Sequence, residues 1–392
     1  MTMKKQTIFG FLLLLVITGC NKVTYNSVSN PAYIRVFNSL NYTTTLDNKD
    51  QPPPFLAMVI DPVFDDSGHI NGGAIIGDYL DQRLPYAPPY PTNAGSTSTI
   101  NNEYPGNEKV LVGPVVNGFD LSSWAQVPSG KHRIQFYSRT KTTVPFLQLP
   151  VNGRQSLLLD TTVTLTQGEI YTMEVLQKDV VSQTNIAELY IRNEQFTKMP
   201  FADSLTYVNF YNLSAAGYWQ ANNAPNSLNG STTPTIRDTI NIYYTLYSPD
   251  STFNPQKNVV PGYQYVPLTT LIRSHDAGVA AYYPIPLFAG KDTTGGIYSH
   301  IWQEFMYLTE GYNPATQPFT FATSLGNYAI VDCSEQYAGT TVGSGGLPNL
   351  NILTASGNNP YQSFSTISSL EWINDQVYLM SVQREYPAPN YN

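Results

Sequence analysis

The stretch Ala32-Tyr33-Ile34-Arg35-Val36-Phe37-Asn38 alternates aromatic and β-branched side chains with others directly after Pro31. A second stretch, Leu205-Thr206-Tyr207-Val208-Asn209-Phe210-Tyr211-Asn212, repeats this pattern. Tyr207 and Asn212 each lie 174 positions after Tyr33 and Asn38. Runs of this composition bounded by turn residues predict β-strands. A pattern that returns after so long an interval predicts two tandem domains and not a solenoid of short repeats.

A second pair of segments supports the duplication. Ile170-Tyr171-Thr172-Met173-Glu174-Val175 resembles Val377-Tyr378-Leu379-Met380-Ser381-Val382, which lies 207 positions later. We therefore expect each copy to open and close with similar strands, and the second copy to be longer. The predicted domains are residues 31–200 and 203–392, each with its own core. The alternative is that any two β-rich segments share such alternation.

The rest of the chain contains many short apolar runs separated by Gly and Pro turns. Only Ala74 to Leu80 and Phe305 to Leu308 are candidates for short helical turns. An all-β protein is predicted, built from two tandem antiparallel β-sandwiches with long loop insertions.

The N-terminus has the features of a secretory signal peptide. Lys4 and Lys5 precede an apolar run from Ile8 to Ile17, and small residues lead to Cys20. The run is too short to span a bilayer as a mature helix. A cysteine in this place resembles the bacterial lipobox, which implies a signal peptide over residues 1–19 and a lipid on Cys20. Residues 20–30 then form a polar tether, and acyl chains on Cys20 provide the membrane anchor.

The composition excludes several classes of function. Charged residues make up 12% of the chain, and the formal net charge is −8. Nucleic-acid binding needs a basic stripe, which is absent outside the signal peptide. The four histidines show no metal-binding spacing, so neither a metal nor another cofactor is predicted.

The segment from Gly168 through Ser214 carries a family resemblance. It contains a Gly-x-x-Tyr-Thr strand, a hairpin into Glu188-Leu189-Tyr190-Ile191, a linker, and a new opening strand that ends in Asn212-Leu213-Ser214. This arrangement resembles the tandem Ig-like domains of unknown function in Bacteroidota lipoproteins. The second copy departs from the family pattern at Asn209, where the family usually has Arg. The first copy has the usual Arg at the matching position, Arg35. The resemblance implies β-sandwich domains and a location in the cell envelope, and it brings no activity.

Two polar clusters contain residue types found in functional sites. Ser274-His275-Asp276 has the residue types of a catalytic triad, but adjacent residues do not usually converge as a triad does. Asp61, Asp65, Asp66, Ser67 and Asn71 precede two glycines and could hold Ca²⁺, but they lack the EF-hand spacing. Both clusters are equally typical of turns, and we favour the turn. The protein is therefore predicted not to be an enzyme.

A short triplet, Asp followed by Ser or Thr and then an apolar residue or Thr, occurs five times. It resembles the O-glycosylation acceptor of Bacteroidota secreted proteins, although Asp-Ser and Asp-Thr are also good turn chemistry. The candidate acceptors are Thr161, Ser204, Thr239, Ser251 and Thr293.

Aromatic residues in two long loops are the candidate ligand-binding residues. Tyr86 and Tyr90 lie among prolines, and Tyr218 and Trp219 lie in an Asn- and Ser-rich stretch. Exposed rings there could stack on a glycan or a protein ligand. The predicted function is a non-catalytic binding or scaffolding lipoprotein of the outer membrane. The alternatives are a glycan-binding accessory lipoprotein of a surface uptake system and a fimbrial or adhesin subunit.

Overall fold

The computed structural model describes residues 28–40, 46, 54–83, 111–180, 187–202, 205–220, 238–247, 259–276, 278–286, 302–309, 313–316, 327–332, 352–353, 367–374, 376–382 and 384. Regular structure in these ranges consists of strands and four short 3-10 turns, so the all-β prediction is confirmed. Within the same ranges, no helix has the length and apolar character needed to cross a membrane.

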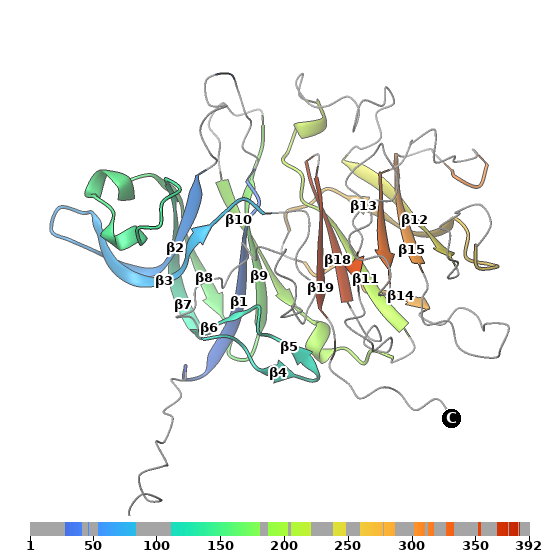
Figure 1. Ribbon diagram of the computed structural model, residues 1–392, viewed down its shortest axis with the longest axis horizontal. Coiled ribbons are helices and arrows are strands. Elements are labelled where there is room, and N and C mark those ends of the chain that lie inside the picture. Colours follow the sequence, from blue (N-terminus) through green and yellow to red (C-terminus); the bar gives the residue numbers. More distant parts are fainter. Residues whose placement is uncertain are drawn as a thin grey trace, which may run out of the picture.

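The first half of the chain forms two four-stranded sheets (Figure 1). The outer sheet has the order β3-β2-β7-β8 and is made of β2 (Phe55–Phe64), β3 (Ile70–Leu80), β7 (Gly130–Arg139) and β8 (Leu157–Leu165). The inner sheet has the order β10-β9-β1-β6 and is made of β1 (Pro31–Asn38), β6 (Ala125–Pro128), β9 (Ile170–Gln177) and β10 (Ala187–Glu194). Strands β4 (Val115–Val116) and β5 (Phe119–Asp120) form a small separate hairpin.

The second half repeats this plan. Its inner sheet has the order β14-β11-β18-β19 and is made of β11 (Leu205–Asn212), β14 (Tyr283–Pro286), β18 (Ile367–Ile373) and β19 (Gln376–Val382). Its outer sheet has the order β13-β12-β15-β16-β17 and is made of β12 (Thr239–Tyr247), β13 (Val266–Ile272), β15 (Trp302–Thr309), β16 (Asn327–Asp332) and β17 (Ile352–Leu353).

Strand pairing shows which strands of the two halves are equivalent. In each inner sheet the opening strand pairs in parallel with a later strand, with Tyr33 opposite Ile170 and Tyr207 opposite Ile367. Each opening strand also pairs antiparallel with an edge strand, β6 or β14. The halves are therefore structural repeats, and the match of the two opening strands is correct.

The sequence match of the closing strands is wrong by one strand. The equivalent of β9 is β18 and not β19, because β9 and β18 are the parallel partners of the two opening strands. Strand β19 pairs antiparallel with β18, as β10 does with β9. Alternation in neighbouring strands of one hairpin is similar, so the sequence pattern could not separate them.

Both predicted helical turns are also wrong. Ala74 to Leu80 belongs to β3, and Phe305 to Leu308 belongs to β15. The β2–β3 ladder shifts register at several points, and Gly73 has a φ of 126°. Such bulges interrupt the alternation of a strand and thus hide it in the sequence.

Each repeat has its own hydrophobic core between its inner and outer sheets. In the first repeat, Ile34, Val36 and Met173 from the inner sheet pack against Met58 and Phe136 from the outer sheet. The second core is formed in the same way; it contains Val208, Phe210, Ile242, Phe305 and Trp372. Both sandwiches therefore bury one face of each inner sheet, as the predicted alternation requires.

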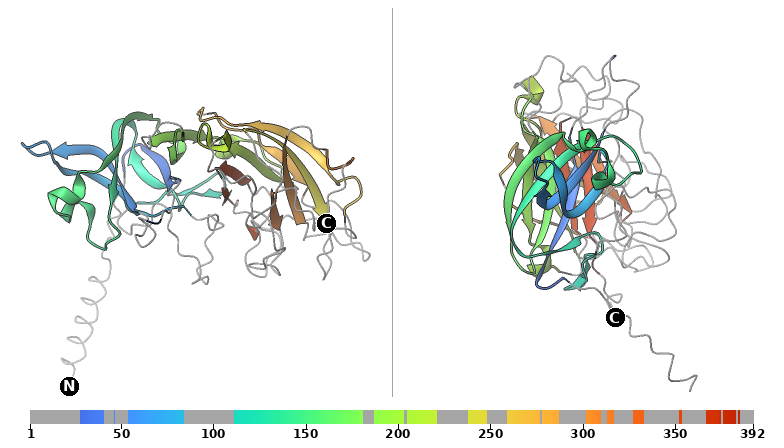
Figure 2. Two further views of the ribbon diagram at one scale, coloured as in Figure 1. Left: turned by 90° about the horizontal axis from the view of Figure 1, so that it is seen from above. Right: turned by 90° about the vertical axis from the view of Figure 1, so that its left-hand side faces the viewer.

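The opposite faces of the two inner sheets are buried against each other. One shared cluster contains Trp124 and Ile170 of the first repeat with Tyr207 and Ile367 of the second. Figures 1 and 2 show the two sandwiches side by side, with the inner sheets toward the middle of the molecule. We refer to this contact between the inner sheets as the joint. It makes both inner sheets buried on both faces.

Candidate functional site

Strand alternation places one glutamate of each inner sheet in the joint. In β9, Met173 and Val175 point into the first core, so Glu174 between them points away from it. In β18, Leu370 and Trp372 point into the second core, and Glu371 lies between them. Both glutamate side chains are fully buried. Two carboxylates in such a place require compensating charges.

The two glutamates occupy equivalent positions of the repeats. Phe37 of β1 lies opposite Glu174, and its equivalent, Tyr211 of β11, lies opposite Glu371. Other equivalent residues of β9 and β18 share clusters, namely Ile170 with Ile367, and Leu176 with Ile373. Equivalent residues that meet in this way lie on a local two-fold axis, which here runs along β9 and β18.

Contacts away from this axis agree with the same symmetry. The guanidinium of Arg192 on β10 lies 4.4 Å from the ring centre of Tyr211 on β11. The equivalent of Arg192 is Met380 on β19, and it packs with Phe37, the equivalent of Tyr211. The joint is therefore an internal pseudo-dimer, in which β10 faces β11 and β1 faces β19.

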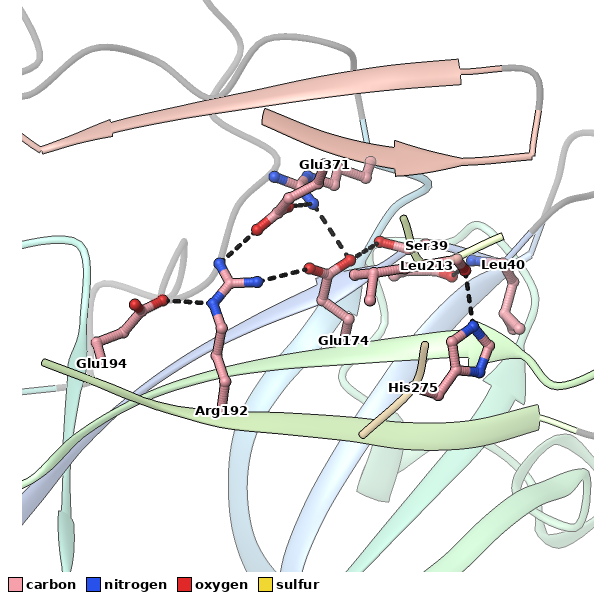
Figure 3. A network of polar contacts seen from close by, with 10 residues as sticks. Ser39, Leu40, Glu174, Arg192, Glu194, Leu213, His275 and Glu371 are labelled. Carbon is pink, nitrogen blue, oxygen red and sulfur yellow. Dashed lines mark hydrogen bonds and ion pairs between the residues drawn. The ribbon is translucent and has the colours of Figure 1, made fainter. Parts of the chain in front are cut away.

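Two arginines bind the glutamates. Nη1 of Arg83 lies 3.2 Å from Glu174 Oε2 and also pairs with Glu371. Arg192 pairs with Glu371 across the joint, and its Nη1 lies 3.7 Å from Glu174 Oε1. Its Nε donates a hydrogen bond of 2.7 Å to Glu194 (Figure 3). We call Glu174, Glu371, Glu194, Arg83 and Arg192 the ionic cluster. It ties the two sandwiches together at the centre of the joint.

The two axial carboxyl groups have opposite pKa shifts. Burial raises the pKa of Glu174 to about 7, and the negative charge of Glu371 adds to this effect. Burial also acts upward on Glu371, but the guanidiniums of Arg192 and Arg83 prevail and lower the pKa of Glu371. A hydrogen bond with Glu174 acts in the same direction on Glu371. The axial pair thus takes up a proton first at Glu174.

The residues Ser274, His275 and Asp276 form a turn, as expected, and not a triad. Ser274 Oγ lies 2.9 Å from Asp276 Oδ2 and accepts a hydrogen bond from the Asp276 backbone N–H. His275 points away from both, pairs through Nδ1 with Glu188 of the first repeat, and lies 2.9 Å through Nε2 from the Leu213 carbonyl. Both ring nitrogens of His275 are therefore engaged at the edge of the joint.

The acidic loop also serves as a turn. Asp65 Oδ1 accepts hydrogen bonds of 2.9 Å from the backbone N–H groups of Ser67 and His69, which closes the β2–β3 hairpin. Asp61 faces β7 instead, where its Oδ2 lies 2.7 Å from Nδ1 of His132. These carboxylates do not converge on one point. Among the described residues, no group of three or more His, Cys, Asp or Glu side chains could hold a metal ion.

The expectation that Tyr218 and Trp219 project from a loop is wrong. Both rings are only 8% exposed, and they pack edge to face against each other within the second core. The short turn η4 (Tyr218–Gln220) directs them inward, because apolar rings gain more from burial than from exposure to water. Tyr86 and Tyr90 lie outside the described residues.

The modification sites are only partly within the described residues. Thr161 in β8 and Thr239 in β12 are half-buried and paired in their sheets, opposite Ile134 and Ile272. Cys20, Ser204, Ser251 and Thr293 lie outside the described ranges.

The ionic cluster was not predicted from the sequence, although a signal was present. Glu174 and Glu371 each stand alone within an apolar strand segment, Met-Glu-Val and Leu-Glu-Trp. A charged residue in a strand without other charges indicates a half-buried edge or a buried ion pair. Only knowledge that both faces of the sheet are buried decides between them.

No family model matches the chain, and no curated protein matches it. Two solved structures show a weak likeness. One is a "putative cell adhesion protein" from Bacteroides ovatus, at 9% identity and a TM-score of 0.17, covering 93% of this chain and 100% of that chain. The other has the same description and comes from Bacteroides uniformis, at 8% identity and a TM-score of 0.15, covering 92% and 99%. With TM-scores this low, we draw nothing about function from either.

Proposed function

We propose that the chain is a lipid-anchored, non-catalytic scaffold of the cell envelope, in which two fused sandwiches form one rigid unit that carries loops for binding. The observation that supports this is that the clustered polar side chains are bound by other groups of the protein. The carboxylates of the ionic cluster are buried and bound by arginines, and His132 and His275 have both ring nitrogens engaged. Such groups hold the fold together and are not available to a substrate.

The anchor is tested by metabolic labelling with a fatty-acid probe in the native host. Cys333→Ala, which changes the other of the two cysteines in the sequence, is the control. We expect the wild type and this control to be labelled and recovered with the outer membrane. Cys20→Ala should lose the label and remain unprocessed or soluble, because the lipid is attached there. Equal labelling of the Cys20→Ala protein would contradict the anchor.

The rigid unit is tested by limited proteolysis of the full chain. Phe196 and Thr197 of η3 (Phe196–Lys198), between the repeats, are buried, so this segment should resist cleavage. First cleavage within residues 195–202, giving two stable halves, would mean that the repeats are flexibly linked domains.

With Tyr218 and Trp219 buried, a glycan-binding role rests on Tyr86 and Tyr90 alone. The double variant Tyr86→Ala/Tyr90→Ala should lose retention on an immobilised ligand while its melting temperature stays unchanged. A Trp219→Ala variant should instead melt at a lower temperature, because it removes a core ring.

A further inference from the structure

The axial glutamates of the joint form an unusual carboxyl pair. They are equivalent residues of two repeats, brought face to face by the local two-fold axis, and a single guanidinium nitrogen, Nη1 of Arg83, contacts both. Each side chain is fully buried. Two ionised carboxylates in such proximity repel each other strongly, because little water screens them.

The charges around Glu174 come from every element packed on it. Arg83 follows β3, and Arg192 and Glu194 lie on β10. Glu371 faces it from β18. The ion pairs of the ionic cluster thus bring two guanidiniums to three carboxylates.

Neutral and stacked groups complete the surroundings of Glu174. Ser39 donates a hydrogen bond of 2.9 Å to its Oε2. Tyr190 from β10 is buried beside the cluster, and Tyr211 and Tyr378 come from the second repeat. Arg35 on β1 also faces the joint, where its guanidinium lies 4.9 Å from the ring centres of Phe37 and Trp124.

We propose that the Glu174–Glu371 pair binds one proton in the native protein near neutral pH, and that the contact between the two repeats is therefore sensitive to pH. A proton held between the two carboxyl groups removes their mutual repulsion, and the protonated carboxyl can then donate a hydrogen bond to the ionised one. Only a proton moves, from solvent to a carboxylate oxygen.

The direction of the pH dependence follows from proton linkage. In the folded protein the pKa of Glu174 is raised to about 7, so Glu174 keeps its proton up to that pH. In the unfolded chain the pKa of Glu174 has its ordinary value of 4.5, so the proton is released above pH 4.5. Stability therefore falls as the pH rises from about 4.5 to 7. The lowered pKa of Glu371 acts in the opposite sense, so that its contribution is lost as the pH falls below 4.5.

The test uses the full chain and compares the wild type with Glu174→Gln, which imitates the protonated side chain. From pH 5 to pH 8, the wild-type melting temperature should fall by at least about 3 °C more than that of Glu174→Gln. Glu169→Gln is the matched control, because Glu169 lies just before β9 and bonds Lys198 and Asn193 outside the cluster. Its pH profile should run parallel to that of the wild type.

Infrared spectroscopy provides a readout that a purely structural role would not change. The wild type at pH 6 should show the C=O stretching band of a buried, protonated carboxylic acid. The band should weaken toward pH 8 and be absent from Glu174→Gln. This measurement on the wild type does not depend on the variant folding. Absence of the band at pH 6, or parallel melting profiles of wild type and Glu174→Gln, would overturn the proposal.

Discussion

The two repeats share a fold but bring different faces to the joint. Both keep the axial glutamate, Glu174 or Glu371, whereas the cations belong to the first repeat. Arg192 is matched by Met380 in the second repeat, and Arg35 is matched by Asn209. In a symmetric pairing, each residue on the axis meets its own equivalent, so two glutamates there cannot neutralise each other. The charge must come from positions beside the axis.

Because of this asymmetry, the face of one repeat is complementary to the face of the other repeat, and neither face is complementary to a second copy of itself. Two first-repeat faces would bring together an excess of buried guanidiniums, because Arg35, Arg83 and Arg192 of each face would meet only Glu174 and Glu194. Two second-repeat faces would leave a pair of glutamates without the arginines that bind them here. Unpaired buried charges disfavour both alternatives, so the charge pattern selects the pairing of unlike repeats.

Removing the guanidinium of Arg192 should have the largest effect on the free energy of unfolding. Arg192→Met gives the first repeat the residue found in the second. It leaves Glu194 without its arginine partner and Glu371 with Arg83 alone. We expect a loss of about 3–5 kcal/mol in the free energy of unfolding, measured by urea denaturation. Arg133→Met is the control, because its ion pair with Asp160 on the outer sheet is exposed, and its loss should stay below about 1 kcal/mol. Equal effects of the two variants would contradict a special role of the joint.

Moving the cation to the other repeat should not restore this loss. In the double variant Arg192→Met/Met380→Arg, the new guanidinium would stand beside Phe37, where that of Arg83 already lies 3.9 Å from the ring centre. Two like charges would then share one side of the axis, and Glu194 would remain without its partner. We expect the double variant to be no more stable than Arg192→Met by urea denaturation. Recovery of half or more of the lost stability would show that the position of Arg83 does not block a second cation.

The sequence was sufficient for the elements whose pattern is local. Tyr33 and Tyr207 mark equivalent strands correctly, because alternation and turn residues are properties of single segments. The strand of the second repeat that is equivalent to β9 could not be identified from the sequence. Strands β18 and β19 have the same alternation, and only their hydrogen-bonded register distinguishes them. The burial of Trp219 and of Glu174 depends on which faces of the repeats meet, and that is a tertiary property that no single segment encodes.

The edge of the joint should contribute much less than its centre. His275→Gln removes the contact of the imidazole with Glu188, whose side chain is 27% exposed. Water screens this pair, so the expected loss is below about 1 kcal/mol by urea denaturation. Ser274→Ala, which alters only the local turn, provides the comparison. A loss for His275→Gln as large as that for Arg192→Met would place the main electrostatic contact at the edge instead of on the axis.

Differential scanning calorimetry of the full chain tests most directly whether the joint makes one unit of the two repeats. The shared central layer predicts a single transition, with equal calorimetric and van't Hoff enthalpies, and Arg192→Met should separate it into two transitions. Two transitions in the wild type, both unchanged by Arg192→Met, would show that the repeats unfold independently and that the joint does not couple them.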